Sequence, residues 1–179
     1  MLKKVGAEYR LSLPSAMEGA LRRYDRHFTA WRPGDYTPRA VKYYKFSPRQ
    51  ALFAVIGDFN GDKRLDVVLD GHNRKMDLTL CIISEGAGYG VREVSRTTVL
   101  SDPKTKVGYS ESATQDEPEY KEYGLSRFLR YNPPCEVVPF EEKKAVKIAN
   151  DAFTEVYFTK AAFLYYYKDG KFHSICTGD

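Results

Sequence analysis

Cysteines are few in this sequence and long apolar runs are missing, and each shortage excludes a class of protein. Three cysteines, Cys81, Cys135 and Cys176, stand far apart among 179 residues, without a CxxC pair. Zinc modules usually bring their ligands in closely spaced pairs, so this spacing does not suggest a zinc site. An odd number cannot all pair within one chain, although a Cys135–Cys176 bridge would suit an exported protein. No run of eighteen apolar residues occurs, so we expect no membrane span.

Signals for export and for catalysis are missing as well. In MLKKVGAEYRLSLP, residues 1–14, two lysines precede no apolar stretch, so we expect that an exported form has lost its leader. No GxSxG motif occurs, and His27, His72 and His173 lie far apart. Carboxylates in 111–122 are more typical of a solvated loop than of a catalytic pair. The sequence leaves the question of an enzyme open and favours a protein without catalytic activity.

Basic residues are concentrated in the first part of the chain. The net charge is +4, but residues 1–50 hold 11 Lys and Arg against 4 Asp and Glu, a surplus of +7. The remaining residues hold 17 against 20, a balance of −3. Because the positive residues are scattered rather than clustered, they predict a solvated helix face, and we expect no nucleic-acid partner.

One segment near the start of the chain has the pattern of an amphipathic helix. We predict a helix at about 14–29, with Ser12 as its cap and Pro14 in its first turn. Apolar residues recur along it at helical spacing and predict a core-facing stripe, namely Met17, Leu21, Tyr24 and Phe28. After this helix, 41–47 is predicted as a short strand.

From residue 51 the apolar period changes to about two, which is typical of strands. The predicted strands fall in 51–95 and 144–176, a polar loop in 101–122, and one helical turn in 123–134. Asp169-Gly170 between two strand-like runs predicts a two-residue hairpin. Fourteen tyrosines also suit half-buried sheet faces. The expected fold class is α+β, a single domain over 1–179 with one antiparallel meander sheet and one N-terminal helix packed on it.

The stretch DFNGDKRLD, residues 58–66, has the composition of a cation-binding loop. Asp58, Asn60, Asp62 and Asp66 occupy its first, third, fifth and ninth places, and the backbone carbonyl of Arg64 is available at the seventh. Oxygen donors with several carboxylates indicate a hard cation, and Ca²⁺ tolerates irregular geometry better than Mg²⁺. The alternative is an acidic turn that binds no metal.

Residues 54–71 resemble the FG-GAP/VCBS-type calcium loop of integrin-like β-propellers, in which one strand enters the loop and the next leaves it. The resemblance implies a Ca²⁺ site and a hairpin, in a single blade-like unit rather than a full propeller. A dockerin or EF-hand loop fits less well, because its twelfth place is acidic and here it is Leu69. The family usually has glycine at the sixth place, where this chain has Lys63, at a cost of about 1–2 kcal/mol in a left-handed conformation.

These observations favour a calcium-binding, non-enzymatic β-rich domain in which the metal is structural. We expect it to be extracytoplasmic, either periplasmic or secreted, and to bind a protein or a glycan. Two alternatives stay open. One is a small hydrolase or lyase with its site outside the loop, and the other is an inhibitor or immunity-type protein.

Overall fold

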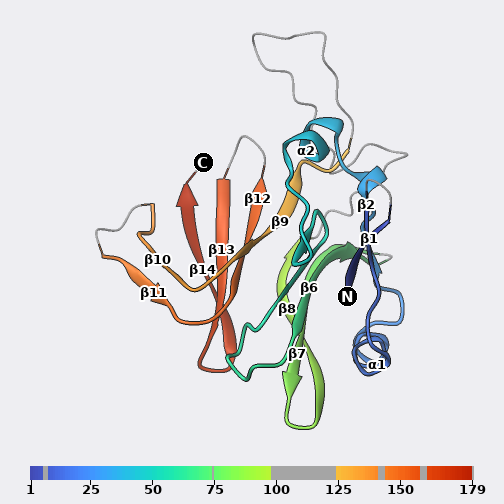
Figure 1. The fold of residues 1–179 in the computed structure, drawn as a ribbon, viewed down its shortest axis with the longest axis horizontal. Helices are drawn as coiled ribbons and strands as arrows, with labels where there is room; N and C mark the ends of the chain where they lie inside the picture. Colours follow the sequence, from blue (N-terminus) through green and yellow to red (C-terminus); the bar gives the residue numbers. More distant parts are fainter. Residues whose placement is uncertain (6–7, 74, 98–123, 141–143, 158–160, 179) are drawn as a thin grey trace.

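The computed structural model describes residues 1–179 except 6–7, 74, 98–123, 141–143, 158–160 and 179. About 55% of the described residues lie in strands and 13% are helical. Within the described part, four sheets and two α-helices form (Figure 1). The predicted α+β architecture, one sheet covered by one helix in a single blade-like unit, is therefore wrong. The predicted loop 101–122 lies outside the described residues.

The largest sheet has six strands in the centre of the molecule. Its main path runs β4-β5-β6-β7-β8, all antiparallel, and β3 also pairs with β6. The β7–β8 hairpin closes at Glu85 and Gly88. The bounds of these strands are β3 Thr29–Ala30, β4 Gln50–Ala51, β5 Ala54–Gly57, β6 Asp66–His72, β7 Asp77–Glu85 and β8 Gly88–Thr97.

The second sheet is built from the C-terminal part of the chain, in the order β14-β13-β12-β9. Its strands are β9 Arg127–Asn132, β12 Ala152–Tyr157, β13 Ala161–Lys168 and β14 Lys171–Gly178. Lys168 pairs with Lys171 across the predicted turn, in which Asp169 and Gly170 have φ of 51° and 81°. The two-residue hairpin at this position is confirmed. Two small hairpins complete the sheets, β1 Leu2–Val5 with β2 Glu8–Leu11 and β10 Cys135–Val137 with β11 Val146–Ile148.

Both faces of the central sheet are covered, which explains the continuous burial of β6 and β7. Alternate side chains point to opposite faces, so Val67 packs into one core and Val68 into the other. One core lies toward the C-terminal sheet, where Leu129 and Phe153 belong to the same cluster as Val68. The other lies toward the N-terminal elements, and Figure 1 shows these two layers on opposite sides of the central strands.

The helices differ from the prediction in length and number. Helix α1 spans Ser15–Tyr24, and Pro14 rather than Ser12 occupies its N-cap position. The chain then turns at Asp25 into β3, because residues 29–30 find strand partners in β6. A second helix, α2 Pro38–Tyr43, follows the short 3-10 helix η1 Pro33–Asp35.

Two further local predictions are wrong. The strand predicted at 41–47 overlaps α2, which is capped where the Thr37 hydroxyl accepts the Ala40 N–H over 3.1 Å. The helical turn predicted in 123–134 is strand β9, which pairs with β12 along its whole length. In both segments, contacts with residues outside the predicted segment outweighed the local propensity of the segment itself. None of the helices in the described ranges is long and apolar enough to cross a membrane.

Candidate metal centre in the loop between β5 and β6

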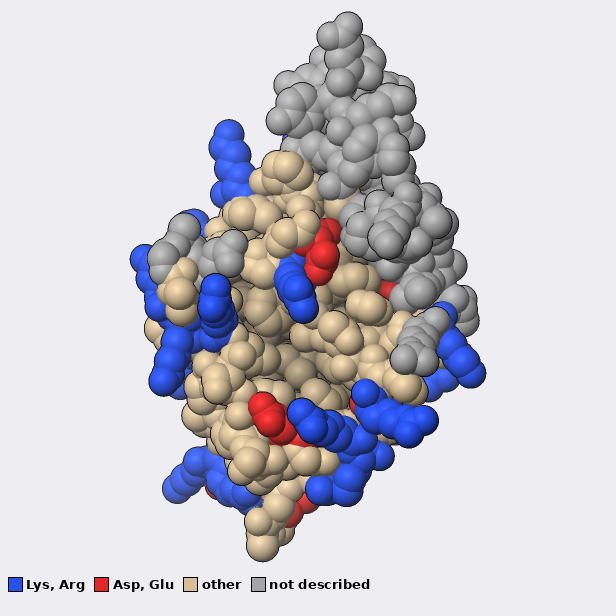
Figure 2. Space-filling view, turned by 90° about the vertical axis from the view of Figure 1, so that its right-hand side faces the viewer, with Lys and Arg blue, Asp and Glu red and all other residues tan. Residues whose placement is uncertain are grey.

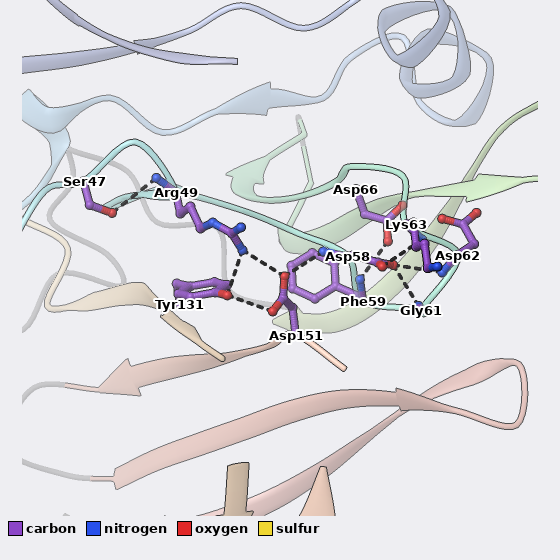
Figure 3. A network of polar contacts seen from close by, with 10 residues as sticks. All are labelled: Ser47, Arg49, Asp58, Phe59, Gly61, Asp62, Lys63, Asp66, Tyr131 and Asp151. Atoms are coloured by element: carbon purple, nitrogen blue, oxygen red, sulfur yellow. Dashed lines mark hydrogen bonds and ion pairs between the residues drawn. The ribbon is translucent and has the colours of Figure 1, made fainter. Parts of the chain in front are cut away.

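The predicted calcium loop, residues 58–66, connects β5 to β6 and is held together by its first residue (Figure 3). The Asp58 carboxylate accepts the backbone N–H groups of Gly61, Asp62 and Lys63 over 2.8, 3.1 and 2.8 Å. An aspartate side chain that binds the amides ahead of it closes a tight turn. Asp58 therefore sets the curvature of the whole loop.

Two residues of the loop adopt left-handed backbone conformations. Gly61 has a φ of 79°, and Lys63 has a φ of 65°. Lys63 and Asp169 are the described non-glycine residues with positive φ. This conformation costs a residue with a Cβ about 1–2 kcal/mol, so the loop around Lys63 stores backbone strain.

The other predicted side-chain ligands meet at one residue of the neighbouring strand, Ser84 in β7. The Ser84 hydroxyl donates to Asp62 over 2.6 Å, and its backbone N–H donates to Asp66 over 2.8 Å. The amide of Asn60 donates to the Ser84 carbonyl over 2.8 Å. The structure thus brings Asn60, Asp62 and Asp66 to a common point, whereas Asp58 faces the loop's own amides.

The carboxylates of this loop experience different environments. Burial raises the pKa of Asp66, although the N–H groups of Ser84 and Phe59 oppose the shift. The hydrogen bond from the Ser84 hydroxyl lowers the pKa of Asp62, which is exposed. A cation beside these groups would lower the pKa of Asp66 and remove part of the penalty for burying its charge.

The side chain of Arg64 contacts the neighbouring β7–β8 hairpin, and its charge adds to the lowering of the Asp62 pKa. Its guanidinium donates to the carbonyls of Gly86 and Gly88 over 2.6 and 3.2 Å and lies 4.9 Å from the ring centre of Tyr89. The loop is thereby fastened to the β7–β8 hairpin. The sequence predicts the backbone carbonyl of Arg64, rather than its side chain, as a metal ligand.

The donor chemistry fits a hard cation, because three carboxylates and the amide oxygen of Asn60 supply oxygen ligands, although Asn60 now directs its NH2 group to Ser84 and its oxygen to the Asp62 N–H. These oxygens accept hydrogen bonds from protein groups, and no group of three or more His, Cys, Asp or Glu side chains in the described ranges is arranged to hold a metal ion. The described loop is a turn stabilised by its own hydrogen bonds, and binding would reorient some of these carboxylates.

A residue that sequence reasoning missed joins the loop to the second sheet. Asp151, directly before β12, accepts the Asp58 N–H over 2.9 Å and donates its own N–H to the Asp58 carbonyl over 3.2 Å. Its carboxylate also accepts from Tyr131 and Arg49 over 2.7 and 3.1 Å (Figure 3). Ninety-three residues separate Asp58 from Asp151, so no local spacing could have revealed the contact.

A second polar cluster is buried between the two large sheets. Arg127 contacts the carboxylates of Asp70 and Asp77 at 3.1 and 3.0 Å and that of Glu155 at 3.9 Å. The three acidic side chains are 1–2% exposed. None of these four residues lines the cavity of about 820 Å³ beside the N-terminal elements or the cavity of about 450 Å³ beside the β13–β14 turn, so a substrate would not reach them from either.

The residues considered for nucleophilic catalysis are not brought together. The three cysteines are free thiols, and the Cys135–Cys176 bridge does not form. Across the described ranges, the hydrogen bonds of the histidine rings go to Arg26 and to the carbonyls of Asn73 and Lys168, not to Ser, Thr or Cys.

Comparison of the chain with protein-family models, with curated proteins and with solved structures found no match.

Proposed function

We propose that this chain is a non-enzymatic, calcium-stabilised β domain whose loop 58–66 binds one Ca²⁺. The observation that carries the proposal is the φ of 65° at Lys63, in the place where calcium loops of the FG-GAP/VCBS type have glycine. A lysine is held in this costly conformation while Asp58 accepts three consecutive loop amides. Asp169 in the β13–β14 turn also has positive φ, so the support for a metal comes from the combination of this conformation with several carboxylates in one loop.

The ligands in this proposal are the side chains of Asp58, Asn60, Asp62 and Asp66 with the carbonyl of Arg64. Bound Ca²⁺ supplies positive charge among three carboxylates, one of which, Asp66, is fully buried. The contact of Asn60, Asp62 and Asp66 with Ser84 supports this set, because it limits the movement needed to reach a common centre.

The role of the metal follows from what the loop touches. Asp58 pairs with Asp151, and the Asn150 amide donates to the Phe59 carbonyl over 3.3 Å. Both partners belong to the turn before β12 in the C-terminal sheet. A metal that fixes the loop therefore stabilises the junction between the two large sheets, and its action is structural.

Thermal unfolding in millimolar Ca²⁺ and in excess EDTA tests the proposal. At a hundredfold excess of Ca²⁺ over Kd, the folded state gains about 2.7 kcal/mol. Asp58→Ala and Asp62→Ala should abolish the response, whereas Glu136→Ala, which removes an exposed carboxylate in β10, should keep it. Equal melting temperatures of the wild type in Ca²⁺ and in EDTA would show that the loop is an acidic turn without metal.

An extracytoplasmic location and a protein or glycan partner belong to the same proposal. Calcium sites without a bidentate glutamate and with a strained loop suit compartments where Ca²⁺ is abundant. Exposed aromatic side chains suit the binding role, since Phe140 is 70% and Tyr43 is 66% exposed. Fractionation of cells that express the native gene, followed by immunoblotting of each compartment, tests the location, and recovery in the cytoplasm alone would contradict it.

A further inference from the structure

A cavity of about 820 Å³ lies between the N-terminal elements and the central sheet. β2, α1, β3 and η1 surround it, and side chains of the central region, Phe53 and Leu69, form part of its floor. Figure 2 looks onto this side of the molecule, where the surface is hollowed near the centre of the view. Cavities that hold small organic ligands have a similar size and a largely apolar lining.

The lining combines an apolar wall with a polar rim. Apolar and aromatic side chains make up most of the wall, namely Tyr9, Leu11, Leu13, Leu21, Phe28 and Trp31. The charged lining residues are Arg10, Arg32, Glu18 and Asp35. Of the two carboxylates, that of Asp35 already accepts the Arg32 backbone N–H over 2.7 Å.

The electrostatics of this side favour an anion. Arg10 and Arg32 form no ion pair with another residue in the described ranges, and both are exposed at the cavity. Residues 1–50, which contribute most of the lining, carry a surplus of +7. Lys and Arg side chains predominate around the hollow face in Figure 2. The lining itself holds two arginines and two carboxylates, so the positive excess comes from the surrounding part of residues 1–50, and it raises the local concentration of anions.

We propose that this cavity binds a small organic molecule with an apolar, preferably aromatic, body and one anionic group. The body fills the wall formed by Leu13, Leu21 and Trp31, and the guanidinium groups of Arg10 and Arg32 bind the carboxylate, sulfonate or phosphate. Glu18 on the same rim disfavours a second negative charge. The site shares no residue with loop 58–66, so it does not depend on calcium.

Trp31 supplies the energy-transfer signal, because it is the chain's single tryptophan and lies in the cavity wall, and substitutions in the lining locate the bound dye. The probe is 8-anilinonaphthalene-1-sulfonate, which has an aromatic body and one anionic group. Its neutral partner is N-phenyl-1-naphthylamine, which has the same body without the sulfonate. Titration of each dye, followed by energy transfer from Trp31, gives a Kd and a stoichiometry. We expect one site, with tighter binding of the anionic dye.

Substitutions in the lining separate the contribution of the arginine charges to dye binding from that of the apolar wall. Arg10→Gln and Arg32→Gln should each weaken the sulfonate dye about twofold to fivefold and leave the neutral dye unchanged. Arg22→Gln removes an exposed arginine of α1 that does not line the cavity, and should change neither dye. Leu13→Asp places a charge in the wall and should abolish energy transfer with both dyes.

Circular dichroism of each variant establishes that the fold is kept. The anionic part of the proposal would be overturned if energy transfer from Trp31 were equal for the two dyes and insensitive to both arginine substitutions. A folded wild-type protein that shows no saturable transfer with either dye would overturn the site. Calcium should leave the Kd values of both dyes unchanged. The cavity proposal and the calcium proposal for loop 58–66 can therefore be refuted independently.

Discussion

Arg127 in β9 donates two hydrogen bonds to the carboxylate of Asp70 in β6, over 3.1 and 3.3 Å, and so connects the two large sheets. It also donates to Asp77 over 3.0 Å and lies near Glu155, so one guanidinium faces three buried acidic side chains. Burial raises the pKa values of Asp70 and Glu155, and the positive charge of Arg127 opposes both shifts. The stability of the sheet junction is therefore coupled to this one side chain and to pH.

Replacement of Arg127 by methionine should destabilise the protein by about 3–5 kcal/mol at neutral pH, because it leaves buried carboxylates without a counter-charge. The loss should be smaller at acidic pH, because the raised pKa values of Asp70 and Glu155 favour their uncharged forms there. Urea unfolding at both pH values measures the difference. The matched control is Arg130→Met in the same strand, where the side chain is exposed and the expected change is within about 0.5 kcal/mol. Equal losses for the two variants would contradict this assignment.

The raised pKa of Glu155 predicts a pH dependence with a defined sign. A carboxyl that binds its proton more tightly in the folded state stabilises that state below its unfolded pKa, and this contribution is lost as pH rises through the folded pKa. Glu155→Gln removes the titration, so its unfolding free energy should fall less than that of the wild type as pH rises from acidic to neutral. Urea unfolding across this range tests the prediction, and parallel curves for both proteins would refute it.

Lys63→Gly should stabilise the loop by relieving its left-handed backbone. Relief of the backbone strain raises the free energy of unfolding by about 1–2 kcal/mol. The greater flexibility of glycine in the unfolded chain lowers it by about 0.5–1 kcal/mol. The melting temperature in EDTA should therefore rise slightly, and Ca²⁺ affinity should increase because a nearby positive charge is removed. Lys45→Gly, at an exposed position without positive φ, is the control and should lower stability. A lower melting temperature for Lys63→Gly would contradict the strain argument.

Gly170→Val should destabilise the β13–β14 hairpin by about 1 kcal/mol or more, because Gly170 has a φ of 81°. A Cβ there would meet no heavy atom within 4 Å, so the cost is conformational rather than steric. Gly88→Val offers the matched comparison, since Gly88 also has open space but no positive φ. Thermal melting of both variants separates the two effects, and an unchanged melting temperature for Gly170→Val would count against the argument.

Features that depend on neighbours in the chain could be predicted from the sequence. Asp169-Gly170 specifies its turn because both positions need positive φ, and the short apolar, β-branched runs in 51–95 specify strands, which the structure buries on both faces. The acidic turn was located for the same reason, since the backbone N–H groups that donate to Asp58 lie only three to five residues ahead of it.

Contacts between distant segments were decided by the tertiary structure alone. The alternating pattern states which side chains share a face but not which strand lies alongside, because backbone N–H and C=O groups are the same in every strand. One sheet was therefore expected where two large sheets form, and neither the Asp58–Asp151 pair nor the Arg127–Asp70 pair was foreseen. Burial across distant segments decided the pairing, and the resulting arrangement covers Val67 and Val68 on opposite faces of one strand.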